Sequence, residues 1–236
     1  FISQCDTEVL VHLYEEDGEG MVHRLRGMFA FALWDRAKQS LLLVRDRLGI
    51  KPLYYTVRSD QGEGANVVFA SELPSLLAAI PAPSLRTGAI ADYLSLLYVP
   101  GPETIYGGVY ELRPGELLRV QNKCVTFERY WTPQEVLNAW DRQAPGETFE
   151  HLHAQLRDAV RSHLVSDVPL GLFLSGGIDS STLLAFMRRE VTGPIRTFSI
   201  GYDAPEDQAF SELAAAKQVA DHFETDHTEA RLRPDA

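Results

Sequence analysis

The segment LSGGIDSS at residues 174–181 has the composition of a turn that holds phosphate groups. It follows an apolar run at 168–174 and precedes a predicted helix at about 180–190. Gly176 and Gly177 have no Cβ, so the backbone can bend sharply there and its N–H groups can approach an anion closely. Serine hydroxyls and the positive end of the helix dipole add to this attraction. The segment therefore predicts a phosphate-binding turn.

Asp179 is the most informative residue of this turn, because bound phosphates repel a carboxylate unless a cation lies between them. It therefore predicts Mg²⁺ at the site. The alternative is an ordinary strand-to-helix turn in which Asp179 or Ser180 only caps the helix. The sequence contains neither a G-x-x-x-x-G-K-S/T run nor a G-x-G-x-x-G run that opens a helix after a strand. A Walker-type ATPase and a dinucleotide dehydrogenase are therefore poorly supported.

The elements that must position this turn alternate between strand and helix. An apolar stripe at steps of three and four residues first predicts an amphipathic helix of about four turns. Its members are Phe149, Leu152, Leu156, Val160 and Leu164. Beyond it, strands are expected at 168–174, 195–200 and about 225–230, with helices at about 180–190 and 208–222. This order predicts a parallel sheet with helical crossovers, whose ligands bind beyond the carboxyl ends of the strands.

The wider segment SDVPLGLFLSGGIDSS, residues 166–181, resembles the opening of the synthetase domain of glutamine-hydrolysing asparagine synthetases. S-G-G-x-D-S alone is shared with other ATP-pyrophosphatases, such as argininosuccinate, GMP and NAD synthetases, and S-D-V-P-x-G narrows the resemblance. Residues 195–203 and 214–229 are similar to the following elements of that family. The resemblance implies that Leu174 and Ile200 line an adenine pocket. It also implies a pyrophosphate and Mg²⁺ site made by Ser175, Gly176, Gly177, Asp179 and Ser180.

One departure from the family pattern concerns His227, which is followed by Thr228 where the family often has two adjacent histidines. We interpret His227 as a polar residue at a strand end rather than as a catalytic group. Its role stays open.

The first part of the chain predicts two short helices and then an antiparallel sheet. Helices are expected at 8–16 and 22–26, strands at 28–34, 41–44, 53–57 and 67–70, and further helices at 72–79 and 87–96. Residues 98–118 are rich in Gly and Pro and should be turn-rich, with strands following near 115–121 and 124–131. The aromatic residues Phe29, Phe31 and Trp34 are expected in the core rather than in a stacking platform, because a spacing of two places Phe29 and Phe31 on one face of a strand.

This part resembles the glutaminase domain of the same family, an αββα sandwich of antiparallel sheets with an N-terminal nucleophile. The resemblance rests on CDTE at 5–8, LRGMFAFALWD at 25–35, VRDRLGIKPLYY at 44–55 and FASEL at 69–73. It implies that Asp6 pairs with the α-ammonium group of glutamine, a charge-assisted contact. The alternative is that Asp6 only caps a helix that begins at Thr7 or Glu8.

The family's nucleophile is a free N-terminal cysteine, and Cys5 does not fit this role because four residues precede it. We therefore assign no catalytic residue within the sequence. Arg45-Asp46-Arg47 could form an anion clamp, but alternating charges beside Gly49 more often hold a turn together, and we favour that interpretation.

Composition narrows the range of partners. The formal net charge is −11, with 22 Lys and Arg against 33 Asp and Glu, which disfavours broad binding to nucleic acid or anionic lipid. No apolar stretch approaches the ~20 residues of a membrane span. Cys5 and Cys124 form no C-x-x-C pair, so a zinc site or disulfide framework has little support. We expect a cytoplasmic protein with small-molecule substrates, and the sequence leaves a homodimer open.

The chain begins with Phe1 rather than Met and ends just after a predicted strand, so we expect a piece of a longer protein. The expected domains are a glutaminase domain at 1–133 lacking its start, a linker at 134–147, and an ATP-pyrophosphatase domain at 148–236 lacking most of its length. The resemblance implies that the intact enzyme, a carbon–nitrogen ligase, forms asparagine from aspartate, glutamine and ATP through β-aspartyl-AMP. This piece alone should perform neither half-reaction. The alternatives are a relative that adenylates another carboxylate, such as a β-lactam synthetase, and a non-catalytic nucleotide-binding relative.

Overall fold

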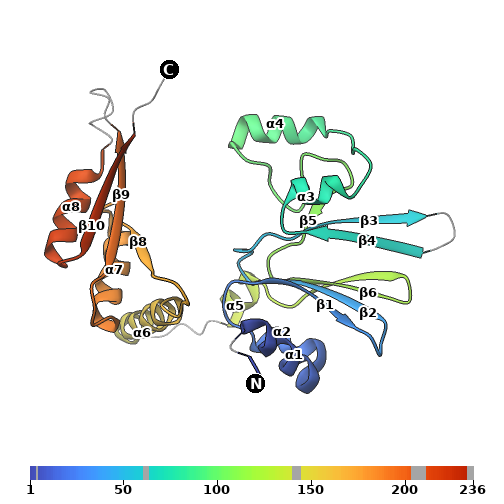
Figure 1. Cartoon of the computed structure of the whole chain (residues 1–236), viewed down its shortest axis with the longest axis horizontal. Coiled ribbons are helices and arrows are strands. Elements are labelled where there is room, and N and C mark those ends of the chain that lie inside the picture. Colours follow the sequence, from blue (N-terminus) through green and yellow to red (C-terminus); the bar gives the residue numbers. More distant parts are fainter. Residues whose placement is uncertain (4, 61–63, 140–144, 203–210, 233–236) are drawn as a thin grey trace. The chain divides into compact units, whose positions relative to one another are not determined.

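The computed structural model divides the chain into two compact units, Phe1–Trp140 and Asp141–Ala236, whose elements are shown in Figure 1. It describes residues 1–3, 5–60, 64–139, 145–202 and 211–232. The boundary between the units lies inside the stretch expected as a linker. That stretch includes a helix, α5 (Pro133–Ala139), and the start of α6 (Pro145–His163). The domain limits themselves stay predictions.

Two antiparallel sheets form the centre of the first unit. One has the strand order β1-β2-β6-β7 and the other has the order β4-β3-β5. The strands of the first sheet are β1 (Ala30–Asp35), β2 (Ser40–Arg45), β6 (Glu116–Gln121) and β7 (Cys124–Arg129). Those of the second are β3 (Tyr54–Asp60), β4 (Gly64–Ala70) and β5 (Tyr110–Glu111). Their antiparallel pairing confirms the expectation from the sequence.

Strand β2 contributes to two cores, because successive side chains of a strand point to opposite faces. Leu42 and Val44 pack with Met21 and Val22 of the helix α2 (Met21–Arg24), on the helical side of the sheet. Leu43 points the other way, into the core shared with the second sheet. A strand covered on both faces needs a continuous apolar run rather than an alternating one. The run LLLV of β2 meets this requirement.

Helices complete the layers of this unit. The helices α1 (Asp6–Asp17) and α2 (Met21–Arg24) cover the first sheet, and α3 (Leu73–Ala78) lies against β3 and β4 of the second. The helix α4 (Thr87–Leu96) follows α3 in the chain. The layers therefore run helix, sheet, sheet, helix (Figure 1), which confirms the αββα architecture expected for this part.

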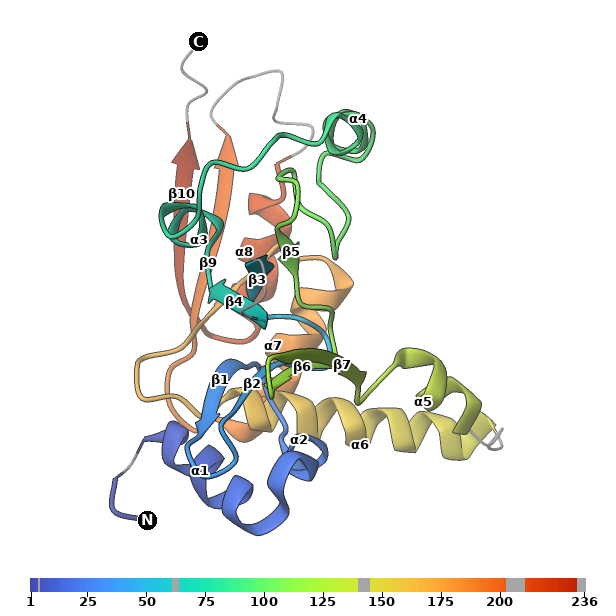
Figure 2. The same cartoon turned by 90° about the vertical axis from the view of Figure 1, so that its right-hand side faces the viewer.

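The second unit contains a parallel sheet with the strand order β10-β9-β8. Figure 2 shows β9 and β10 running side by side in the same direction. After α6, its elements are β8 (Gly171–Phe173), α7 (Ile178–Glu190), β9 (Arg196–Tyr202), α8 (Leu213–His222) and β10 (Asp226–Leu232). The parallel sheet with helical crossovers was predicted and is confirmed, whereas its place in the ATP-pyrophosphatase fold stays a prediction.

The core of the second unit lies between this sheet and the helices α7 and α8. Its buried members are Leu174, Leu184, Ile195, Ala216 and Ala220. Of the helices in the described part of the chain, none is both long enough and apolar enough to cross a membrane.

Candidate functional site

The predicted phosphate turn connects β8 to α7, where Gly176 approaches α8 closely. The φ angle of Gly176 is +80°, in the left-handed region that favours glycine. A Cβ at this position would lie 2.5 Å from the carbonyl carbon of Ala215 and from the amide nitrogen of Ala216. Both constraints require glycine, so the turn is shaped against the backbone of α8.

Two serine hydroxyls hold the turn together. Ser175 Oγ and Ser180 Oγ are 3.0 Å apart, and the backbone N–H of Ser175 donates to Ser180 Oγ at 3.3 Å. Gly177 N–H donates to Ser175 Oγ at 3.2 Å. The residue that follows β8 is hydrogen-bonded to β9, because Leu174 N–H donates to the Phe198 carbonyl at 2.8 Å. The structure therefore brings Ser175, Gly176, Gly177 and Ser180 together in one turn, and their binding of pyrophosphate stays a prediction.

The N-terminus of α7 has no side-chain cap. Gly177 occupies the N-cap position, and the first described helical bond runs from Ser181 N–H to the Gly177 carbonyl. The alternative in which Asp179 or Ser180 caps the helix is therefore wrong. The N–H groups of the first helical turn have no partner inside a helix, and with the helix dipole they form a site for an anion.

Asp179 lies in the first turn of α7 and is exposed. Within the described ranges, no group of three or more His, Cys, Asp or Glu side chains could hold a metal ion. Asp179 therefore belongs to no such group in the part of the chain that the structure describes. Mg²⁺ is often bound by one carboxylate together with phosphate oxygens and water, and a single exposed carboxylate beside an anion site fits that mode.

The two residues expected at an adenine pocket have different surroundings. Leu174 is only 2% exposed and packs in the core with Leu184 and Ala216. Ile200 on β9 is 53% exposed. In this structure, Leu174 is therefore a core residue at the base of the turn, and of the two only Ile200 presents its side chain openly.

His227 is the second residue of β10, and its side chain is buried. Its side chain is 3% exposed, and Nδ1 lies 2.8 Å from the hydroxyl oxygen of Thr197, which in turn lies 2.7 Å from that of Thr225. The signal that sequence reasoning missed is the alternation along β9, where Thr197 and Ser199 occupy buried positions. Nε2 of His227 and the buried hydroxyl of Ser181 have no hydrogen-bond partner among the described residues.

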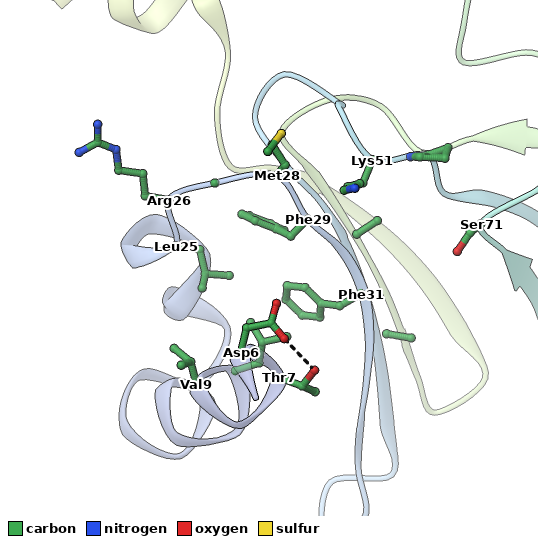
Figure 3. Close-up of a pocket in the computed structure, with 15 residues that line it drawn as sticks. Asp6, Thr7, Val9, Leu25, Arg26, Met28, Phe29, Phe31, Lys51 and Ser71 are labelled. Atoms are coloured by element: carbon green, nitrogen blue, oxygen red, sulfur yellow. Dashed lines mark hydrogen bonds between the residues drawn. The ribbon is translucent and has the colours of Figure 1, made fainter. Parts of the chain in front are cut away.

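The first unit has its own cavity of about 520 Å³, which is lined by Asp6 (Figure 3). Asp6 is the first residue of α1, and no side chain caps that helix. Asp6 therefore does not act as the cap that the alternative interpretation required. Its Oδ1 accepts a hydrogen bond from the Thr7 hydroxyl at 3.4 Å.

The other walls of this cavity come from three separate segments. One wall contains Leu25 at the end of α2, the next contains Phe29 and Phe31 at the start of β1, and the third contains Lys51. Figure 3 shows Lys51 beside Met28 at the end of the cavity away from Asp6. Phe29 and Phe31 also pack against the core, with ring centroids 5.8 Å apart, as predicted. The same prediction was wrong for Trp34, which is 52% exposed. A small ligand in this cavity would contact a carboxylate, apolar walls and an ammonium group.

Two family models match the chain, one for each unit. The model described as "Glutamine amidotransferase domain" matches residues 1–131, and the model described as "Asparagine synthase" matches residues 151–236. The first match contains Asp6 and its cavity, and the second contains the phosphate turn.

Several curated proteins are similar along most of the chain. Asparagine synthetase (glutamine-hydrolyzing) 1 of Bacillus subtilis (strain 168) is 37% identical over 93% of this chain and 33% of its own length. Asparagine synthetase (glutamine-hydrolyzing) 3 of the same strain is 36% identical over 86% of this chain and 33% of its own length. A putative asparagine synthetase of Methanocaldococcus jannaschii is 34% identical over 94% of this chain and 42% of its own length. The chain thus spans about a third of the two Bacillus relatives.

Among solved structures, one described as "Structure of the allosteric regulatory enzyme of purine biosynthesis" matches 98% of this chain and 63% of its own, at a TM-score of 0.38 and 12% identity.

Proposed function

Because this chain belongs to the glutamine amidotransferase family and its second unit matches the asparagine synthase family, we propose that it serves ATP-dependent asparagine synthesis with glutamine as nitrogen donor. The observation that carries this proposal is the presence in one chain of a carboxylate-bearing cavity and an uncapped phosphate turn, each inside its matching family segment. The proposed overall reaction converts aspartate, glutamine, ATP and water into asparagine, glutamate, AMP and pyrophosphate.

In the first unit, Asp6 would bind the α-ammonium group of glutamine. Its carboxylate is open to the cavity, which is lined mainly by apolar groups, and there a charge-assisted contact is stronger than in water. Glutamine is small enough for a cavity of about 520 Å³. The role of Asp6 is to orient the substrate, and we assign the bond-breaking nucleophile to no described residue.

In the second unit, the turn at 174–181 would bind the pyrophosphate part of ATP. The N–H groups at the start of α7, with the hydroxyls of Ser175 and Ser180, provide hydrogen-bond donors and the positive end of a helix dipole. Leu174 and Ile200 would lie at the adenine side of this site. The aspartate carboxylate would attack the α-phosphorus of ATP, forming β-aspartyl-AMP and releasing pyrophosphate, and ammonia would then displace AMP.

Mg²⁺ fits the turn at Asp179, the exposed carboxylate of the first helical turn. When bound, the ion would offset the charge of the pyrophosphate. Asp179 would hold it jointly with phosphate oxygens, since the described residues supply no cluster of acidic side chains there.

A direct test uses the protein expressed from its whole gene. With aspartate, glutamine, ATP and Mg²⁺ present, we expect asparagine and pyrophosphate to form in equal amounts, and omission of aspartate should stop both. If pyrophosphate forms only when another carboxylic acid replaces aspartate, the enzyme is a relative that activates that acid. If no acid supports pyrophosphate release, the proposal fails and a non-catalytic nucleotide-binding protein remains.

The same preparation tests two expectations from the sequence that stay predictions. Light scattering after gel filtration measures whether the protein is a homodimer. Fractionation of the source cells measures whether it is cytoplasmic.

A further inference from the structure

Three consecutive charged residues at the end of β2, Arg45, Asp46 and Arg47, have no role in the function proposed above. We call them the charged tripeptide. Arg45 is 6% exposed and Asp46 only 1%. Such burial is costly unless each charge is hydrogen-bonded or paired. The partners of these side chains therefore indicate what the tripeptide does.

Asp46 makes hydrogen bonds to backbone groups of its own loop and of the segment before β1. Its Oδ1 accepts from Leu48 N–H at 3.1 Å and from Ile50 N–H at 3.0 Å, and its Oδ2 accepts from Lys51 N–H at 3.0 Å. Its own N–H donates to the Phe29 carbonyl at 2.8 Å. Asp46 therefore fixes both Lys51 and Phe29, and each of these lines the Asp6 cavity.

Arg45 holds the same loop from its other side. Its Nε donates to the Lys51 carbonyl at 2.9 Å, and Nη2 donates to the Gly49 carbonyl at 2.7 Å. An ion pair with Glu111 at 2.8 Å balances its charge. The two peptide groups of Lys51 are thus held by neighbouring residues, the N–H by Asp46 and the carbonyl by Arg45.

Arg47 reaches a different wall of the cavity. Its Nη1 donates to the Leu25 carbonyl at 2.7 Å, and its Nη2 donates to the His23 carbonyl at 3.0 Å. These carbonyls lie at the C-terminal end of α2, where helical carbonyls lack partners within the helix. Leu25 also lines the cavity. The interpretation of the tripeptide as a holder of turns was therefore correct, and the held segments are cavity walls.

We infer that the charged tripeptide is a set of positioning residues for the glutamine cavity. It fixes the walls that carry Leu25, Phe29 and Lys51 relative to one another, and these walls face the helix that carries Asp6. A ligand that pairs with Asp6 must also fit these walls, and a misplacement of about 1 Å can cost roughly a hundredfold in rate. The inference rests on the proposed function, because it takes glutamine as the ligand.

The test measures KM and kcat for glutamine in the protein expressed from its whole gene. Arg47→Met removes both hydrogen bonds to the Leu25 wall and keeps the apolar stem, whereas Arg47→Lys restores a donor. We expect Arg47→Met to raise KM for glutamine about tenfold or more, and Arg47→Lys to recover part of that loss. Asp46→Asn, which replaces one acceptor of the loop by an amide N–H₂ group, should raise KM in the same way.

Two controls separate positioning from simple loss of folded protein. Arg36→Met removes an exposed arginine from the turn between β1 and β2, and it should leave KM unchanged. Synthesis with ammonia in place of glutamine should be unaffected in every variant, because it bypasses the cavity.

A variant that merely folds less well lowers kcat and leaves KM for glutamine as it was. That result for both Arg47→Met and Asp46→Asn would overturn the inference. If Asp46→Asn does not fold, the comparison of Arg47→Met with Arg47→Lys still tests the inference. A wild-type protein that does not use glutamine would instead contradict the proposed function, and this would be seen before any variant is compared.

Discussion

Gly176 shows how the shape of a binding turn can be fixed by a single residue. Its left-handed φ of +80° disfavours any side chain, and the space that a Cβ would need is taken by backbone atoms of Ala215 and Ala216. Backbone atoms cannot rotate away as a flexible side chain can. Any side chain here must therefore displace α8 or distort the turn.

The substitution Gly176→Ala should lower the free energy of unfolding of the second unit by about 2 kcal/mol or more, from backbone strain and overpacking together. Denaturation in urea measures this. Gly193→Ala is the matched control, because a Cβ there has nothing within 4 Å and its φ is not left-handed. Equal stability of the two variants would contradict the tight packing of the turn.

Asp179 allows a prediction that separates a metal ligand from a structural residue. Asp179→Asn should weaken ATP binding about tenfold when Mg²⁺ is present, because a charged ligand is replaced by a neutral one. In EDTA the variant should bind ATP no worse than the wild type, since the repulsion between carboxylate and phosphate has gone.

Isothermal titration with and without Mg²⁺ makes the comparison, and Asp226→Asn at the exposed start of β10 serves as the control. An equal loss of affinity in both solutions would show that the substitution damages the turn rather than a metal site.

At the scale of elements, β2 and the segment after β7 illustrate how the layers of the first unit are joined. β2 sends Leu42 to the helical core and Leu43 to the core between the sheets. Just beyond the end of β7, Tyr130 is buried, and its hydroxyl donates to the Arg45 carbonyl at 2.6 Å. Tyr130 belongs to the helical core, whereas Tyr55 of β3 belongs to the core between the sheets.

Burial raises the pKa of Tyr55 and of Tyr130 from the ordinary value of 10.0 to about 12. The neutral phenol is therefore favoured in the folded state. Its contribution to stability is complete below pH 10 and is lost as the pH rises from about 10 to about 12.

Ultraviolet difference titration of the folded protein should show these two phenols ionising later than exposed ones, and Tyr130→Phe should remove one of the late ionisations. If both late ionisations are still present in Tyr130→Phe, the assignment of one of them to Tyr130 is wrong.

Elements that end or begin through tertiary pairing were the hardest to predict from the sequence. The strand expected at 168–174 is only Gly171–Phe173, because its length is set by pairing with β9 and because Pro169 has no N–H to offer. The two-residue strand β5 is defined by its pairing with Tyr54 and Tyr55 of β3. Pro169 is a local signal for the late start of β8, whereas the pairing that defines β5 has no local signal.

The helix α5, by contrast, has a local signal that was overlooked. The Thr132 hydroxyl accepts from Glu135 N–H at 3.3 Å, and the Glu135 carboxylate accepts from Thr132 N–H at 3.2 Å. This is a capping box, and the sequence T-P-Q-E also places Pro133 at the first helical position. A helix start could therefore have been predicted immediately before the expected linker.

At the scale of the whole molecule, the sequence was most informative where chemistry is local. The phosphate turn depends on consecutive residues, and its glycines and serines assemble as predicted. The surroundings of His227 could not be predicted, because Thr197 lies on a strand that only the tertiary structure brings near. The same holds for the bond from Asp46 N–H to the Phe29 carbonyl, whereas the Asp46 carboxylate accepts from N–H groups of its own loop. The polar residues buried along β9 show the same dependence.

We propose that the first unit binds glutamine and the second binds ATP, and we therefore predict that one substitution can affect the use of glutamine alone. Asp6→Asn should raise KM for glutamine about tenfold or more, because it removes the charge that pairs with the α-ammonium group. Synthesis with ammonia should stay at the wild-type rate, since ATP and aspartate are handled elsewhere.

Rates of asparagine formation with each nitrogen source test this, and Asp92→Asn, an exposed position on α4, is the control. A fall in the ammonia-dependent rate equal to that with glutamine would rule out the separation.

The place of β8 in its sheet has a dynamic consequence. This strand has three residues and, among the described strands, pairs only with β9, yet it leads directly into the turn that would hold pyrophosphate. A short strand at the edge of a sheet opens locally at a lower free-energy cost than a central one. An anion bound to the turn would restrain that opening. Amide hydrogens of β8 should therefore exchange with solvent readily in the free protein and slowly in the nucleotide complex, so this strand would report occupancy of the site.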